Sequence, residues 1–204
     1  TNLAAQTAVY GISSIAAVLL NYLLTQYLTC IMTEAKYGVL TDMYALIPFA
    51  MVGLSMGMES LFFRFAGKQE STAVKMKVFT TTWGAVTGVS VLFMCVVLLF
   101  RNDIAMATGY SGHVSYVWIV GAIIGLDAIT AIPFARLREQ GRAGRYVVVR
   151  VASVVINVVM CVFFYSALPR LAGAGILEGM YDPAFGPGYV FVANLIASAA
   201  ALLI

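Results

Sequence analysis

The sequence predicts an all-α fold, a polytopic integral membrane protein built as a six-helix transmembrane bundle. Of its 204 residues, 62% are hydrophobic and only 10% are charged, whereas soluble domains have about 45–50% apolar and about 25% charged residues. Crossing the hydrocarbon core takes roughly 20 apolar residues, and apolar runs of this kind recur along the chain. The run from Val78 to Phe100 lacks the alternation of polar and apolar residues that barrel strands require. Helices are therefore the expected spans.

Charged residues and turn formers divide the chain into six expected spans. They cover residues 8–32, 38–64, 77–100, 114–137, 145–167 and 188–204. The first span ends before the charged segment EAKYG, and the third lies between Lys77 and Arg101. The fourth ends at the arginine cluster that begins with Arg136, and the fifth follows that cluster from Arg145.

The second and sixth spans are less regular. The second contains Pro48, and a proline inside a transmembrane helix is tolerated where neighbouring helices bind the carbonyl that it frees. The sixth starts at Gly188 and extends about 25 Å at about 1.5 Å per residue, slightly short of the roughly 30 Å core. We therefore expect the natural polypeptide to continue beyond Ile204.

The distribution of lysine and arginine predicts the orientation. Nine of the 12 basic residues flank the connections from span two to three and from span four to five: Arg64, Lys68, Lys75, Lys77, Arg136, Arg138, Arg142, Arg145 and Arg150. The alternate connections hold the others, Lys36, Arg101 and Arg170. Because cytoplasmic loops of membrane proteins carry the excess of Lys and Arg, the N-terminus is predicted to be cytoplasmic.

Pairs of glycines four residues apart occur on three of the spans. They are Gly53/Gly57, Gly84/Gly88 and Gly121/Gly125. Such pairs let helix backbones approach closely in lipid. They predict tight helix packing and carry no information about function.

Asp127 is the acid that a membrane span should tolerate least. It lies about 13 Å from Arg136 along span four, close to the bilayer midplane, where a charge costs at least about 2.5–3.5 kcal/mol. We expect it to face the bundle interior, either in an ion pair that locks two helices or on a transport pathway. Pro133 follows on the same span and removes the hydrogen bond to the Ile129 carbonyl. Pro133 and Pro48 are therefore candidate hinges.

Polar residues recur along one face of spans one and five. They are Arg150, Ser153, Asn157 and Cys161 on span five, and Tyr10, Ser14, Asn21 and Thr25 on span one. At this spacing each set shares a helical face, which either bonds neighbouring helices or lines a wet cavity. Two complete stripes with asparagine at mid-depth favour the cavity. Glu59 lies about 7–10 Å inside span two, so Glu59, Asp127 and Arg150 are expected within reach of one another.

Motifs of soluble enzymes are absent from the sequence. It contains no GxxxxGK[ST] phosphate loop, no HExxH and no GxSxG, and its single histidine, His113, falls in a predicted outer loop. The three cysteines show neither CxxC nor Cys/His spacing. The net charge of +3 is spread over short loops and reflects topology. We expect no enzymatic activity, no catalytic residue, no cofactor, no metal site and no nucleic-acid partner.

Two stretches of the sequence resemble a known family. In the first half, GISSIAAVLLNYLLTQYLT is followed by EAKYG and then by GMESLFFRFAGK. In the second half, LDAITAIPFARLREQGRAGRYVVVRVASVVINVV places an acid before a Pro-Phe step, a Leu-Arg pair and a short basic turn. In order and spacing these stretches resemble bacterial polysaccharide flippases of the multidrug/oligosaccharidyl-lipid/polysaccharide exporter superfamily.

The resemblance implies that residues 1–204 form the N-terminal one of two six-helix lobes around a central cavity, and that a C-terminal lobe of the same protein completes it. It implies a secondary transporter that flips oligosaccharide linked to polyprenyl diphosphate across the bacterial cytoplasmic (inner) membrane by alternating access. This activity would serve the biosynthesis of lipopolysaccharide or another cell-surface polysaccharide. The implied partners are this anionic lipid, membrane lipid and H⁺ or Na⁺ as the coupling ion.

Six residues are candidates for the substrate or ion pathway: Asp127, Arg150, Glu59, Arg64, Asn21 and Asn157. An anionic diphosphate requires Arg or Lys in the cavity, so Arg64 and Arg150 together favour the flippase, whereas each of them alone is better explained as an anchor on the cytoplasmic side. A multidrug exporter of the same superfamily would take cations and favour a cavity dominated by acids. A non-transporting membrane scaffold for envelope assembly is a third alternative. The sign of the cavity's charge separates the first two.

Overall fold

The computed structural model describes residues 3–69, 71–174, 179 and 181–204, with side chains for all of these except 3–10 and 12–14. This part of the chain consists of helices and connections, without a strand. Four helical stretches are long and apolar enough to cross a membrane, namely Glu34–Ser55, Thr72–Leu99, Ser111–Glu139 and Ala143–Gly173. Ile15–Ile31 and Gly188–Leu203 are shorter apolar helices. The predicted class, an all-α polytopic membrane protein, is confirmed.

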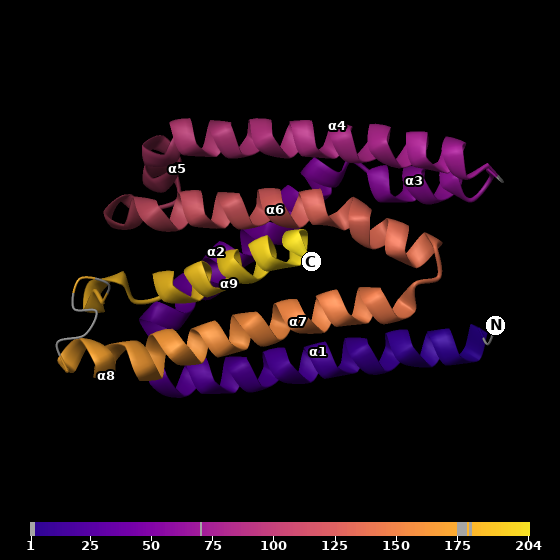
Figure 1. Cartoon of the computed structure of the whole chain (residues 1–204). Coiled ribbons are helices and arrows are strands. Elements are labelled where there is room, and N and C mark those ends of the chain that lie inside the picture. The colour runs from indigo at the N-terminus through magenta and orange to yellow at the C-terminus, as the bar shows by residue number, and fades with distance from the viewer. Residues whose placement is uncertain (1–2, 70, 175–178, 180) are drawn as a thin grey trace.

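The long helices run side by side in a bundle. In chain order the helical elements are α1 (Leu3–Ile31), α2 (Glu34–Ser55), α3 (Met58–Ala66), α4 (Thr72–Leu99), α5 (Arg101–Ala107), η1 (Ser111–His113), α6 (Val114–Glu139), α7 (Ala143–Val162), η2 (Phe163–Ala167), α8 (Leu168–Gly173), η4 (Pro183–Phe185) and α9 (Gly188–Leu203). In Figure 1, α6 and α9 lie between α4 on one side and α7 with α1 on the other, and α2 crosses behind them. Predicted spans 8–32, 77–100, 114–137 and 188–204 correspond to α1, α4, α6 and α9.

The second expected span, residues 38–64, is not one helix. Helix α2 continues unbroken through Pro48 and ends at Ser55, and α3 starts at Met58. Between them Met56 and Gly57 both adopt left-handed backbone conformations, with φ of 45° and 70°. A left-handed residue ends a right-handed helix, and glycine adopts this conformation without steric cost. The interruption therefore lies at Gly57 and not at the proline.

The fifth expected span, residues 145–167, also differs from the helices that form. Helix α7 passes into a π-helical turn, η2, and continues as α8 to Gly173. The hydroxyl groups of Tyr27 and Ser166 are 2.6 Å apart, which ties this turn to α1. A π-helical turn depends on such tertiary contacts and leaves no recognisable pattern in the sequence. The sequence therefore does not predict that the helix continues beyond residue 167.

Helix α6 is the core of the bundle, because it contacts α4, α9, α2 and α3. One pair of glycines makes its close approach to α4 possible. A Cβ atom on Gly121 would lie 2.6 Å from Cγ1 of Val97, and one on Gly125 would lie 2.5 Å from Cγ of Met94. At the other two expected pairs, Gly53/Gly57 and Gly84/Gly88, an added Cβ would meet nothing within 4 Å. Of the predicted packing pairs, only Gly121/Gly125 meets a neighbouring helix in the described structure.

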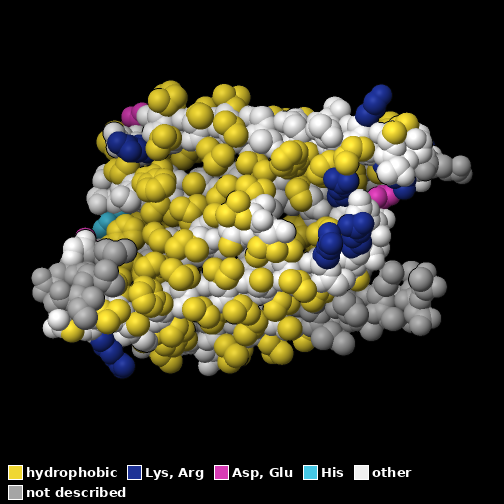
Figure 2. Space-filling view, viewed as in Figure 1, with side chains coloured by type: hydrophobic (Ala, Val, Ile, Leu, Met, Phe, Trp, Pro, Cys, Tyr) yellow, Lys and Arg dark blue, Asp and Glu magenta, His cyan; other side chains and the backbone are white. Residues whose placement is uncertain are grey.

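The two ends of the bundle have different chemistry. We call the end with the α3–α4 and α6–α7 connections the basic end, because most lysines and arginines lie there. Between the ends, hydrophobic side chains cover much of the face shown in Figure 2, as expected of a surface in contact with lipid. Elsewhere on the surface, Phe49 of α2 and Leu99 of α4 are 80% and 77% exposed.

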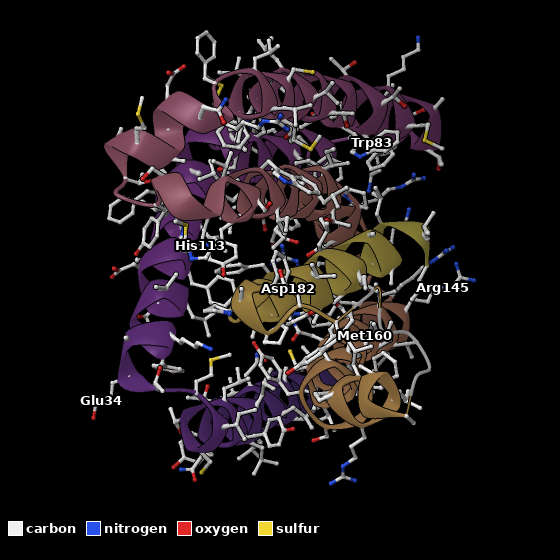
Figure 3. All side chains as sticks on the ribbon, turned by 90° about the vertical axis from the view of Figure 1, so that its left-hand side faces the viewer. Glu34, Trp83, His113, Arg145, Met160 and Asp182 are labelled. Atoms are coloured by element: carbon white, nitrogen blue, oxygen red, sulfur yellow. The ribbon has the colours of Figure 1, made fainter. Side chains whose placement is uncertain are left out.

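The opposite end, which we call the aromatic end, is covered by the segment that precedes α9. The hydroxyl of Tyr116 donates a hydrogen bond to the Phe185 carbonyl at 2.6 Å, and that of Tyr165 donates to the Gly186 carbonyl at 2.7 Å. The ring of His113 stacks on Tyr116 with 4.7 Å between centroids. Figure 3 views this end, where His113 and Asp182 lie near the middle of the bundle. These contacts hold the connection to α9 across the end of the lobe.

Candidate functional site

A cavity of about 480 Å³, partly open to the surface, lies between α1, α2, α6, α7 and α9. We call it the central cavity. Its polar lining consists of Asn21, Thr25, Tyr37, Thr41, Tyr44, Asp127, Arg150, Ser153, Asn157, Asn194 and Ser198. Most of its apolar lining residues belong to the core cluster of the bundle, namely Leu24, Leu28, Leu40 and Val190. The central cavity is thus a polar chamber in an apolar helix bundle.

Four of the six sequence candidates line this cavity: Asn21, Asp127, Arg150 and Asn157. They come from three helices that are far apart in the sequence, and the helical spacing explains why each points inward. Ser153 and Asn157 follow Arg150 on one face of α7, as their spacing predicts. Of the stripe predicted on span one, Asn21 and Thr25 line the cavity, whereas the side chains of Tyr10 and Ser14 lie outside the described part of the structure.

Asp127 has two polar partners in the cavity. The Ser198 hydroxyl forms a hydrogen bond with its carboxyl group, and Arg150 interacts with it electrostatically. Asp127 and Arg150 do not form a direct ion pair, since the ion pairs among the described side chains are Lys75–Glu139 and Arg138–Glu59. In this conformation Asp127 is therefore not part of a closed salt bridge between α6 and α7. Its charge is free to change partner if the cavity changes shape.

Further hydrogen bonds position the cavity wall. The Asn194 side-chain amide donates to the Tyr44 hydroxyl at 3.3 Å, the Cys161 thiol donates to the Asn157 side-chain carbonyl at 3.4 Å, and Ser153 donates to the Ala197 carbonyl at 3.3 Å. Tyr44, Asn194 and Ser198 were not among the sequence candidates. Asn194 was detectable as an asparagine within the apolar segment GYVFVANLIASAA, whereas nothing near Tyr44 distinguishes it from a core aromatic residue.

A second cavity of about 280 Å³, the inner chamber, adjoins the first toward the basic end. The two share Asp127, Arg150 and Ser153. Glu59 also lines the inner chamber, but its ion-pair partner is Arg138 and not Arg150. The Arg138 guanidinium lies over the rings of Phe63 and Tyr146, 5.5 and 5.8 Å from their centroids. The expected group of Glu59, Asp127 and Arg150 thus shares one chamber, with Arg138 as an additional member.

Arg64 lies elsewhere. It is exposed on α3 and lines neither the central cavity nor the inner chamber. Residue 64 faces outward because α3 buries Phe62 and Ala66 against α4 and α6, and the break at Gly57 sets which face that is. The expectation that Arg64 contributes to the cavity is therefore not met in this conformation.

The two candidate hinges are also placed by the structure. Helix α6 continues through Pro133, and the Ile129 carbonyl that this proline frees accepts a hydrogen bond from the Trp83 indole N–H of α4, at 3.2 Å. Pro48 is exposed on α2. Helix α4 therefore stabilises α6 at Pro133 through this hydrogen bond. The interruption that follows α2 lies at Met56 and Gly57, and not at Pro48.

The charge of the cavity is balanced. Among its described lining residues, the central cavity has one carboxylate, Asp127, and one guanidinium, Arg150. The inner chamber adds the paired Glu59 and Arg138. Among the described residues no group of three or more His, Cys, Asp or Glu side chains is placed to hold a metal ion. The arrangement suits a pathway in which a proton or small ion changes partner between Asp127 and its neighbours.

Comparison with known proteins adds a family. The MatE family model matches residues 35–163, from the start of α2 to the first residue of η2. The matched region contains Asp127, Arg150 and Asn157. No curated protein and no solved structure matches the chain.

Proposed function

The chain belongs to the MatE family and is a membrane transporter of the multidrug/oligosaccharidyl-lipid/polysaccharide exporter superfamily, and we propose that it is one lobe of a flippase for lipid-linked oligosaccharide. In this proposal residues 1–204 are the N-terminal lobe, and a C-terminal lobe of the same protein completes the transporter. The substrate is an oligosaccharide on polyprenyl diphosphate, moved across the bacterial inner membrane for cell-surface polysaccharide synthesis. The N-terminus and the basic end face the cytoplasm. The chain has no catalytic role.

The observation that carries the proposal is the pair of adjoining polar cavities that share Asp127 and Arg150. Buried charges do not stabilise a helix bundle in lipid, because each costs several kcal/mol if it is left without partners. Their presence between the helices therefore indicates a functional role. Arg150 is exposed to the cavity and has no direct ion pair among the described side chains. A guanidinium in this position is suited to a diphosphate, while the polyprenyl tail remains in lipid.

Asp127 is the proposed coupling residue. Its carboxyl group is bonded by Ser198 of α9 and influenced by Arg150 of α7, so a relative movement of these helices would change its partners. Binding of H⁺ or Na⁺ at Asp127 would then favour one arrangement of the lobe over the other. Transport requires only that the ion bind the two arrangements with different affinity.

The balanced charge of the cavity is also compatible with a multidrug exporter. A multidrug exporter needs an acidic site for cations, and Asp127 in the central cavity offers one carboxylate. The finding of one acid and one base does not favour either sign of substrate, so the proposal rests on Arg150 and its exposure. A scaffold without transport activity would require Arg150 only as one of the basic residues on the cytoplasmic side, and it predicts that Arg150→Gln leaves transport unchanged.

The test uses the full-length protein in cells. Asp127→Asn keeps the size and most hydrogen bonding of the side chain, and Arg150→Gln removes the cation. Their matched controls are Asp103→Asn and Arg101→Gln, which change exposed residues of α5 at the aromatic end. The flippase proposal predicts that both cavity variants reach wild-type abundance and lose surface polysaccharide, while lipid-linked oligosaccharide accumulates inside. The controls should export normally.

Other outcomes separate the alternatives. Wild-type export with Asp127→Asn removes this residue from the mechanism, and a parallel fall of abundance and export makes it a structural residue. Loss of ethidium efflux with unchanged surface polysaccharide identifies a multidrug exporter. Unchanged polysaccharide and unchanged efflux in both cavity variants would remove Asp127 and Arg150 from the transport mechanism and overturn the assigned site.

A further inference from the structure

Another cavity, of about 660 Å³, lies at the basic end, between the α6–α7 connection, the start of α7 and the end of α9. We call it the basic-end cavity. It adjoins the inner chamber, with which it shares Thr130, Phe134 and Ala201. Its charged residues are different ones, since no arginine of the basic-end cavity lines either of the two polar chambers.

Its charge is strongly one-sided. Arg136, Arg142 and Arg145 line it, and no carboxylate is among its described lining residues. The neighbouring cavity of about 450 Å³ shares Arg136 and Arg142 with it and also contains Glu139, whose carboxylate lies 2.6 Å from Lys75 and pairs with that lysine. Arg145 lines the basic-end cavity but not this neighbour. Arginines whose only purpose is to mark the cytoplasmic side need no cavity and gain by pairing with acids at the surface. Three of them around one cavity, with no carboxylate among its described lining residues, make that cavity electropositive and suited to an anion.

The cavity is also amphipathic. The Arg136 guanidinium is held 4.3 Å from the centre of the Phe79 ring, which fixes one cation on the α4 side. Val148 and Leu202 form part of an apolar wall of the cavity, and the Val148 side chain is 63% exposed. Figure 3 shows Arg145 pointing away from the helices, on the side of the molecule opposite α2. Figure 2 shows basic side chains gathered at this end, next to a hydrophobic face.

We propose that the basic-end cavity binds the phosphate headgroup of an anionic membrane phospholipid, with an acyl chain along the apolar wall formed by Val148 and Leu202. The site lies at one end of the spanning helices, which is the depth at which headgroups lie. Basic pockets between transmembrane helices on the cytoplasmic side are suited to such headgroups. A free phosphate would use the arginines but leave the apolar wall without an occupant. This lipid is a bound partner and not the transported substrate, so the site is independent of the proposed function.

The experiment is a lipid titration of the purified full-length protein, followed by native mass spectrometry. The probes are phosphatidylglycerol and, as the zwitterionic reference, phosphatidylcholine with the same acyl chains. The site variant is Arg142→Gln with Arg145→Gln. The matched control is Lys68→Gln with Lys77→Gln, which removes two basic charges of the same end that line none of the described cavities. A Lys or Arg next to an anionic headgroup contributes about fivefold to its binding, so the site variant, which removes two arginines that line the cavity, should weaken phosphatidylglycerol binding by about tenfold to thirtyfold. The two control lysines line none of the described cavities and act on the headgroup only through a surface potential that salt screens, so the control should change binding less than about twofold. Phosphatidylcholine binding should stay the same in both variants.

A second variant tests the apolar wall and covers the case that the arginine variant does not fold. Val148→Trp leaves every charge in place and fills the part of the cavity assigned to the acyl chain, so it too should weaken phosphatidylglycerol binding. Equal losses in the site variant and the lysine control would overturn the proposal, because they would indicate a diffuse surface potential. Displacement of the lipid by millimolar inorganic phosphate would also overturn it, since the apolar wall would then contribute nothing. A site variant that binds phosphatidylglycerol normally but no longer binds polyprenyl diphosphate would also overturn the proposal, because the cavity would then belong to the transport substrate.

Discussion

The hydrogen bond between Trp83 and the Ile129 carbonyl offers a sharp test of how this bundle tolerates Pro133. The proline cannot donate to the carbonyl four residues before it, and the indole N–H of Trp83 supplies the missing donor at 3.2 Å. Trp83→Phe removes this donor. It keeps an aromatic ring that can stack on Phe79, whose ring is 6.0 Å away and nearly parallel. Ile129 is only 6% exposed, so its carbonyl would be left without water or protein as a partner.

The size of the effect follows from that burial. A buried acceptor left unsatisfied costs about 1–3 kcal/mol, so Trp83→Phe should lower the free energy of unfolding by about that amount. In a Pro133→Ala background the new backbone N–H can donate to Ile129 along the helix. The same Trp83→Phe substitution should then cost less by about 1–2 kcal/mol, which is the coupling energy of the pair.

The assay is equilibrium unfolding of the purified protein in mixed micelles by increasing SDS, followed by far-UV circular dichroism. The four proteins of the cycle are the wild type, the two single variants and the double variant. Trp118→Phe is the control for a generic loss of indole surface, because Trp118 is 37% exposed at the other end of α6. If Trp83→Phe costs the same with proline and with alanine at position 133, the carbonyl is not what the indole stabilises, and the account of Pro133 is wrong.

Three further predictions concern packing, backbone and topology. Gly121→Ala should lower the free energy of unfolding by about 1–3 kcal/mol, because the added methyl group would meet Val97. In Gly84→Ala the methyl group meets nothing within 4 Å, so this substitution should raise the free energy of unfolding by up to about 1 kcal/mol. SDS unfolding measures both changes, and equal effects would contradict the assigned packing. Met56→Gly should stabilise by about 0.5–1 kcal/mol in the same assay, since it relieves a left-handed φ of 45° on a side chain that is 69% exposed; a loss of stability would show that the Met56 side chain is needed. A cysteine at position 68, in a background without native cysteines, should react with an impermeant thiol reagent only after lysis; labelling in intact cells would reverse the proposed orientation.

The candidate site shows which of its parts a sequence can reveal. Asp127, Arg150 and Asn157 stand out because each is a polar residue within an apolar run, and lipid excludes such residues from the outer surface of a bundle. The helical repeat then places Arg150 and Asn157 on one face without any knowledge of neighbours. Tyr44 could not be found in this way, since a tyrosine is equally at home in a core, and its role depends on the Asn194 amide of a distant helix.

The sequence by itself determined the class of fold and the apolar segments, because the bilayer fixes the length and polarity of whatever crosses it. The tertiary structure alone decided where those segments break and which polar groups meet. Nothing local distinguishes Gly121 of α6, where an added Cβ would meet Val97 of α4, from Gly84 of α4, where an added Cβ would meet nothing within 4 Å. The pairing of Glu59 with Arg138, and of Trp83 with the carbonyl freed by Pro133, joins residues on different helices. Such contacts arise from the relative rotation and depth of packed helices, which the periodicity of one helix does not contain.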